Sequence, residues 1–238
     1  MKKLLVSLLL LFVPTLAFAA IARSGTPSSG AAAATSVTFA HDNGSPTNGL
    51  TVVNCGNLQG VDDIVGVTYG GQAMVQMNAI DQTINNYLYA LVNPPAGNNN
   101  VVCTFTGSHT IRATAASYSG VSQTGLPDSQ NTGYDNNSGA KTVTVTTNVV
   151  ASNSWLVGGS LDDGDTLVSG NASTNLVING TSNQSQFWDS SSTVGTGNQS
   201  MKLTWGAPSD ADLNLISIAP AVASAAVTRQ RVITIFEE

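Results

Sequence analysis

The chain has 238 residues and a charged fraction of 9 %, far below the roughly one quarter that is usual for globular domains. Eight basic and 14 acidic residues give a net charge of −6. Without Lys2 and Lys3, which lie in the N-terminal segment, 6 basic residues face 14 acidic ones, a net charge of −8. Such a surface repels nucleic acid and anionic lipid, so neither is expected as a partner.

Residues 1–19 have the features of a secretory signal peptide. Two lysines precede an apolar stretch over residues 4–13, Pro14 interrupts it, and Ala17-Phe18-Ala19 is a typical cleavage pattern. Because the apolar stretch is shorter than the ~20 residues that span a bilayer, we expect cleavage after Ala19 and no membrane span afterwards. The mature protein is therefore expected to be secreted, either extracellular or on the cell surface.

The composition of the mature chain predicts an all-β fold. Thr, Val, Ser, Asn and Gly are abundant, whereas the strong helix formers are scarce: the only glutamates are Glu237 and Glu238, and the only lysines after the signal are Lys141 and Lys202. Short β-branched segments are separated by Gly, Pro, Asn and Asp, the pattern of an antiparallel β-sandwich of jelly-roll type. We expect strands at residues 36–41, 50–55, 64–69, 72–77, 86–92, 101–106, 111–121, 141–147, 154–160, 175–180, 201–205 and 213–219.

These segments are expected to form one domain over residues 36–220. A flexible leader over residues 20–35 would precede it, and an Ala-rich spacer with a C-terminal strand, residues 221–238, would follow. Gly70-Gly71 predicts a two-residue hairpin turn, because both residues can take positive φ. Residues 164–200, rich in Ser, Asn, Thr and Gly, are read as long loops around one or two strands.

The only two cysteines, Cys55 and Cys103, both lie in β-branched stretches. After export to an oxidising compartment, such a pair usually closes a disulfide. A catalytic or metal-binding thiol would need a nearby base or further ligands, and neither His41 nor His109 has ligand spacing to a cysteine. The pair is therefore predicted to be a structural disulfide.

Four segments together resemble a known type of domain: "VTYGGQAM" at residues 67–74, "YLYALVNPPAG" at 87–97, "ASYSGVSQT" at 116–124 and the late Trp-containing strand at 201–205. The combination is similar to an uncharacterised domain of secreted or surface proteins from environmental bacteria and of some phage virion proteins. The resemblance covers roughly residues 36–220. It implies a β-sandwich of this length without established enzymatic activity, and it transfers no functional residues.

The residues themselves do not indicate an enzyme. A glycosidase needs two carboxylates facing each other across a cleft, whereas every carboxylate within the expected domain is an aspartate in a loop, where Asp favours turns. A serine hydrolase would need a Gly-x-Ser-x-Gly elbow or a positioned histidine, and no such elbow occurs in the sequence. We expect no catalytic residues and no cofactor.

Two ligand sites remain as alternatives. Asp162, Asp163 and Asp165 surround a glycine in "LDDGDT", which leaves calcium open as a ligand, although the segment is too short for an EF-hand loop. Trp188, preceded by Phe187 in the polar stretch "QSQFWDSSS", is a candidate for stacking on a sugar, because the two rings cannot both point inward along a regular strand. A carbohydrate-binding jelly-roll module is thus the alternative function.

The last residues favour a structural role. Two arginines precede an apolar run and two glutamates end it; the expected assembly residues are Arg229, Arg231, Val232, Ile233, Ile235 and Phe236. An exposed apolar strand invites aggregation and should be covered. It either closes the protein's own sheet or docks on a neighbour by strand addition. The sequence therefore favours a secreted, non-enzymatic structural protein of surface, filament or virion type, with itself or a surface glycan as partner.

Overall fold

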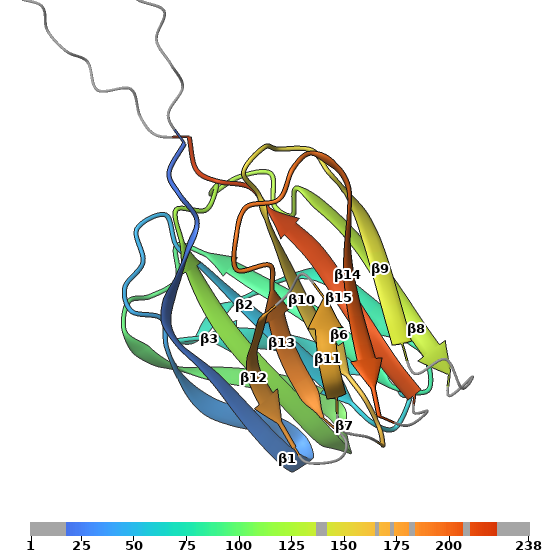
Figure 1. Cartoon of the computed structure of the whole chain (residues 1–238). Coiled ribbons are helices and arrows are strands. Elements are labelled where there is room, and N and C mark those ends of the chain that lie inside the picture. The colour runs from blue at the N-terminus through green and yellow to red at the C-terminus, as the bar shows by residue number, and fades with distance from the viewer. Residues whose placement is uncertain are drawn as a thin grey trace, which may run out of the picture.

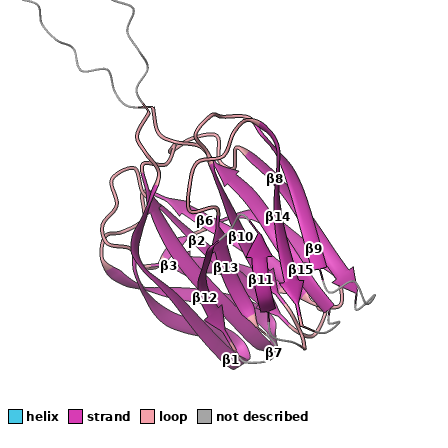
Figure 2. Ribbon diagram, viewed as in Figure 1, coloured by secondary structure: helices cyan, strands magenta, loops and turns pink. Residues whose placement is uncertain are grey.

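The computed structural model describes residues 18–136, 142–164, 167–171, 174–180, 184–206 and 210–222. In this part of the chain every regular element is a β-strand (Figure 2). All strand pairs are antiparallel. The predicted all-β, antiparallel sandwich is therefore confirmed.

Within the described residues, fifteen strands form three sheets (Figure 1). The curled sheet, which is nearly barrel-shaped, contains β1 (Ala22–Asp42), β2 (Leu50–Asn57), β3 (Ile64–Tyr69), β4 (Gln72–Ala73), β5 (Val75–Asp81), β6 (Asn85–Val92) and β7 (Asn98–Ser119). The middle sheet contains β8 (Ser129–Asn136), β10 (Trp155–Leu161), β12 (Thr174–Asn179), β13 (Ser185–Asp189) and β15 (Asp210–Ile218). The outer sheet contains β9 (Thr142–Val149), β11 (Leu167–Asn171) and β14 (Gly197–Trp205).

Three buried clusters hold these layers together. The first lies inside the curled sheet and includes both cysteines. The second joins the curled sheet to the middle sheet, and the third joins the middle sheet to the outer sheet. Because side chains alternate along a strand, the middle sheet must be apolar on both faces, and β10, β13 and β15 are buried along almost their whole length.

Several sequence predictions are confirmed in detail. The Gly70-Gly71 turn has φ of +56° and +78°, and Tyr69 pairs with Gln72 across it. Met201, Leu203 and Trp205 point into the third cluster, whereas Lys202 between them is exposed. Both observations follow from local rules, namely the φ demands of a two-residue turn and the two-residue period of a strand.

The expected flexible leader is wrong. Residues 22–34 form the first part of β1 and pair with β7 from Ser119 back to His109. At Gly30 the segment packs closely, since an added Cβ would lie 2.5 Å from the Phe39 ring. Its other side chains are exposed or half-buried, so the segment shows no apolar alternation from which a strand could be predicted.

The structure has more strands than the sequence predicts. Residues 164–200, where long loops around one or two strands are expected, contain β11, β12 and β13 as well as the start of β14, and no strand is predicted at β8. β8 reads "SQNTGYDN" and is mostly exposed or half-buried, since it lies at the edge of the middle sheet and pairs only with β15. An edge strand with little buried area carries no apolar alternation that a sequence analysis could detect.

Candidate functional site

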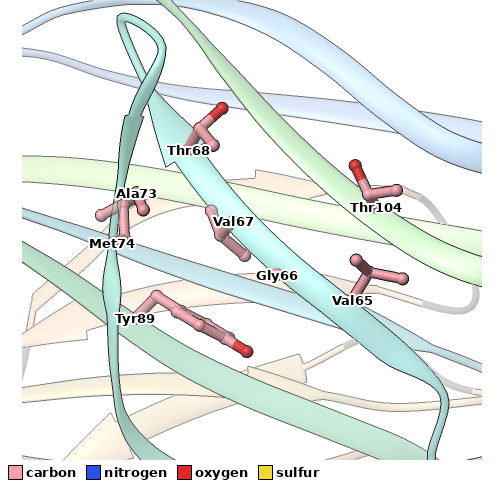
Figure 3. A pocket seen from close by; sticks show the side chains of 8 residues that line it. All are labelled: Val65, Gly66, Val67, Thr68, Ala73, Met74, Tyr89 and Thr104. Carbon is pink, nitrogen blue, oxygen red and sulfur yellow. The ribbon is translucent and has the colours of Figure 1, made fainter.

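The curled sheet comes close to closing on itself, and a break in its wall remains between β3 and β5. β3 pairs with β4 only at Thr68 and Tyr69, and the Met74 amide donates to the Val67 carbonyl at 2.9 Å. Beyond that bond β3 and β5 diverge (Figure 3). Among the described strands, β3 from Ile64 to Gly66 has β7 as its one partner.

The divergence creates a cavity of about 340 Å³, which we call the seam groove. Its lining residues are Val65, Gly66, Val67, Thr68, Ala73, Met74, Tyr89 and Thr104 (Figure 3). Val67, Met74 and Tyr89 form the buried floor, while Val65 on the rim is 65 % exposed. Val75, which follows Met74 on the β5 side, is 62 % exposed. The groove is thus an apolar hollow with an apolar rim.

The polar side-chain groups that line the seam groove are all hydroxyls. Tyr89 donates its hydroxyl proton to Gln76 Oε1 at 2.9 Å. Burial, reinforced by the nearby cysteines and Asp62, raises the pKa of Tyr89 to about 12, so the phenol stays neutral at physiological pH. Thr68 and Thr104 supply the other hydroxyls. Such a lining suits apolar side chains and neutral hydrogen bonds, and it lacks a general base for catalysis.

One carboxylate–imidazole pair lies below the groove, where β7 bulges. Asp63 Oδ2 accepts hydrogen bonds from Thr106 Oγ1 at 2.8 Å, the Gly107 amide at 2.7 Å and His109 Nε2 at 2.9 Å. Burial would raise the pKa of Asp63, but these hydrogen bonds outweigh it and lower the pKa. The ring of Phe105 stands edge-on to that of His109. The cluster fixes the bulge.

The other histidine is an internal connector. His41 is 1 % exposed, and its two ring nitrogens are hydrogen-bonded to Ser28 Oγ at 2.9 Å and Ser117 Oγ at 2.8 Å. Ser117 is in turn bonded to Thr51 Oγ1. Burial lowers the pKa of His41 to about 4, so the ring is neutral at pH 7. Because the ring is buried, this Ser–His contact connects strands inside the protein and is not accessible from solvent.

A polar zone occupies one half of the interface between the curled and middle sheets. Asn86 Nδ2 donates to Asp212 Oδ1 at 2.7 Å, Asn214 Nδ2 donates to the Asn86 carbonyl, and Asn54 Nδ2 donates to the Ser160 carbonyl. All of these side chains are fully buried apart from Ser160, which is 1 % exposed. Burial raises the pKa of Asp212 well above its usual range. The zone fixes the register of the two layers.

The same interface contains an ion pair whose carboxylate is buried. Arg23 of β1 donates through Nε and Nη2 to the two carboxylate oxygens of Asp189, whose side chain is fully buried. Tyr118 donates its hydroxyl proton to the same carboxylate at 3.1 Å. The hydrogen bond to Asp189 raises the pKa of Arg23. Through this pair, the segment expected to be flexible is tied to the middle sheet.

The two cysteines meet inside the curled sheet. Cys55 on β2 and Cys103 on β7 are fully buried, belong to the same cluster and are hydrogen-bonded to each other as thiols. Burial raises the pKa of Cys55 well above its usual value, which makes the thiol a poor nucleophile. The predicted disulfide joins two residues that are in contact, and its closure remains a prediction.

The expectation that Trp188 is exposed for sugar stacking is wrong. Trp188 is 4 % exposed and Phe187 is fully buried. Both rings are inside because β13 belongs to the middle sheet: Phe187 packs against the curled sheet and Trp188 against the outer sheet. The indole Nε1 donates to Gln186 Oε1 at 3.2 Å. The argument from strand alternation assumed one covered face, whereas this strand has two.

Asp162 and Asp163, two of the three aspartates proposed for calcium, lie in different surroundings. Asp162 is buried and accepts from Gln186 Nε2, whereas Asp163 is exposed and accepts from the Asp210 amide at 3.0 Å. In the described ranges no three His, Cys, Asp or Glu side chains are placed to hold a metal ion together. Asp165 lies outside the described residues, as do the expected assembly residues Arg229, Arg231, Val232, Ile233, Ile235 and Phe236.

The sequence analysis missed the seam groove. Its single local signal is Gly66 inside a strand, since a strand glycine often marks a bulge, and the register of β3 against β7 shifts between Ile64 and Gly66.

Among the residues that the structure describes, no helix has the length and apolar character that a membrane span needs. Comparisons of the chain with protein-family models, with curated proteins and with solved structures gave no match.

Proposed function

We propose that the mature chain is a secreted, non-enzymatic structural protein of surface, filament or virion type, whose subunits assemble through the C-terminal strand. The observation that carries the proposal is the position at which the described chain ends. The Ala221 amide donates to the Gly120 carbonyl at 2.8 Å, and Val222, the last described residue, lies at one end of the body (Figure 1). Val222 is 61 % exposed, so the segment after it starts at the surface.

The length and composition of that segment support the proposal. Sixteen residues, 223–238, follow Val222, and an extended chain of this length reaches up to about 50 Å. The apolar run within it, residues 232–236, is costly to leave in water. A neighbouring subunit can cover the run by strand addition, which uses backbone hydrogen bonds and side-chain pockets together.

The burial of the polar side chains also favours a structural role. The histidines, the cysteines and the Arg23–Asp189 pair are engaged in packing, and the seam groove is lined by apolar and hydroxyl side chains. The three tryptophans, Trp155, Trp188 and Trp205, are between 3 % and 8 % exposed. Their burial removes the main argument for the carbohydrate-binding alternative, because stacking on a sugar needs an accessible ring.

The test is the size of purified residues 20–238 and of residues 20–226, measured by light scattering and negative-stain microscopy. We expect regular oligomers or fibres for the longer chain and a folded monomer for the truncated one. A monodisperse monomer for both chains would overturn the proposal. An unfolded truncated chain would mean instead that the C-terminal strand closes the protein's own sheet.

A further inference from the structure

We propose that the seam groove is the acceptor for the C-terminal strand of a second copy. This inference rests on the proposed function, because it names the surface to which the assembling strand binds. Residues 232–236 of one subunit would insert between β3 and β5 of its neighbour. The inserted strand would fill the break in the curled sheet.

The backbone of the groove can accept a strand. The edge of β3 away from β7 is bonded to β4 at Thr68 and Tyr69 and to Met74 at Val67, but from Ile64 to Gly66 it has no partner among the described strands. Unpaired strand edges are templates for pairing with another chain. A strand of about five residues matches the six-residue length of β3.

The side chains of the groove fit the apolar run of the tail. On an inserted strand, Ile233 and Ile235 would share one face and Val232 and Phe236 the other. The cavity of about 340 Å³ is at the small end of the ~300–1,000 Å³ range of ligand pockets, a size suited to one or two aliphatic side chains. We assign Ile233 and Ile235 to the cavity.

The rim of the groove suits the other face of the inserted strand. Val65 and Val75 are 65 % and 62 % exposed, on the two sides of the break. Val232 and Phe236, on the outer face of the strand, would lie beside these valines. The contact would remove four apolar side chains from water, which is the main source of affinity in such a contact.

Charge complementarity sets the direction of the inserted strand. Between residues 20 and 226 the chain has 4 basic and 12 acidic residues, a net charge of −8, whereas Arg229 and Arg231 lie just before the apolar run. Asp62, which is exposed, and Asp63 lie just before β3. A strand parallel to β3 brings the arginines to these aspartates, and a strand in the opposite direction would bring Glu237 and Glu238 there.

This direction favours a second copy over the protein's own tail. Asp63 contacts the bulge of β7, while the Gly70-Gly71 turn at the other end of β3 lies beside Pro95. The turn end of β3 lies near the place where Val222 leaves the body. Asn43 is hydrogen-bonded to Gly97 and to Ser24. Ser24 in turn pairs with Ser117, close to the C-terminal end of β7 and to Val222. Residues 223–228 reach about 20 Å when extended, and the length of β3, also about 20 Å, would use up this reach before the protein's own arginines came to Asp62. The tail of a second copy, which can approach from the Asp62 end, is under no such constraint.

The experiment uses the full mature chain and two matched substitutions. Val65→Arg places a charge on the groove rim, and Val150→Arg places one on an equally exposed valine, 68 % exposed, next to the outer sheet. Light scattering measures assembly. A fluorescently labelled synthetic peptide of residues 227–238 measures binding to the truncated chain, residues 20–226, by anisotropy.

We expect Val65→Arg to abolish assembly and to weaken peptide binding at least tenfold, and Val150→Arg to change neither. Ile235→Asp in the peptide should also lose binding. Thermal melting of the substituted chains should match the parent, because both valines are exposed.

Three other outcomes would overturn the inference, and they separate it from the proposed function. If tail deletion abolishes assembly but Val65→Arg assembles normally, the acceptor lies elsewhere and the proposed function stands. If the full chain is monomeric and the peptide does not bind, both proposals fail. If the full chain is monomeric but the peptide binds the groove of the truncated chain, the tail occupies its own groove, and both proposals fail again.

Discussion

Buried polar residues give this protein a pH dependence that its low charge would not suggest. The pKa of His41 is lowered to about 4 by burial, against about 6.5 in an unfolded chain. Between these values the unfolded chain binds a proton that the folded protein excludes. The free energy of unfolding therefore falls as the pH is lowered from about 6.5 to about 4, by on the order of 3 kcal/mol.

Urea denaturation at several pH values measures this fall. The groups facing His41 are the hydroxyls of Ser28 and Ser117, the Tyr69 ring at a centroid distance of 5.7 Å, and the nearby charge of Asp42. His41→Gln is expected to flatten the pH dependence and to lower stability at pH 7 through lost hydrogen bonds. If the free energy of unfolding of His41→Gln depends on pH as steeply as that of the parent, another group causes the pH dependence.

Asp212 gives the opposite dependence. Burial raises its pKa, as does the nearby charge of Asp162, while hydrogen bonds from the Leu161 amide and Asn86 only partly oppose the rise. The folded state therefore holds a proton that the unfolded state releases above about pH 4, and stability falls as the pH rises toward the folded pKa. In the folded protein the neutral carboxyl of Asp212 is more stable than the ionised one, because burial disfavours the charge.

Asp212→Asn is expected to raise the free energy of unfolding at pH 8 by about 1 kcal/mol, and by less at pH 5. The added amide lies beside Asn86, whose Nδ2 contacts Asp212 Oδ1 at 2.7 Å and whose Oδ1 lacks a hydrogen-bond partner in the described residues. Urea denaturation at the two pH values gives the comparison. A loss of stability at both would mean that an ionised carboxylate is required.

At the scale of the strand, the first half of β1 is a structural element whose removal should be costly. Arg23→Leu leaves the buried Asp189 without its cationic partner. Breaking a fully buried pair costs about 3–5 kcal/mol, and we expect a smaller loss here because the Arg23 side chain is 36 % exposed. The double substitution Arg23→Leu with Asp189→Leu is expected to recover much of the loss, because it removes the unpaired charge as well. Equilibrium denaturation measures both variants. Full stability of Arg23→Leu would show that the segment contributes nothing to the fold.

Strands also show where local patterns stop being informative. β3 has the predicted bounds, and β14 follows the two-residue period over its predicted part, residues 201–205, but begins earlier, at Gly197. β13 has one apolar ring after another, and the sequence does not say that both of its faces are covered. Its burial depends on a curled sheet and an outer sheet that are built from distant parts of the chain.

At the scale of the whole molecule, a disulfide would tie β2 to β7 inside the curled sheet. Closing the loop between Cys55 and Cys103 stabilises the fold by about 4 kcal/mol in the chain-entropy description. We expect the protein purified from an oxidising compartment to have a mass lower by two hydrogens, and Cys103→Ser to lose about that stability. Two free thiols after denaturation and alkylation would contradict the prediction.

The sequence by itself determined the all-β class, the Gly70-Gly71 turn and most strands, because turn chemistry and side-chain alternation act over a few neighbouring residues. It also placed the two cysteines in strands whose buried faces meet. Of the candidate site, the sequence offered only Gly66, since the seam groove arises where β3 and β5 diverge after sharing one hairpin.

Only the tertiary structure decided which polar and aromatic side chains are buried. Trp188 became a core residue because a third sheet covers the outer face of its strand, and Arg23 became part of the fold because Asp189 is buried where β1 passes. Burial depends on which layers stack on each other, and that stacking joins residues more than a hundred positions apart. No local pattern in the chain carries this information.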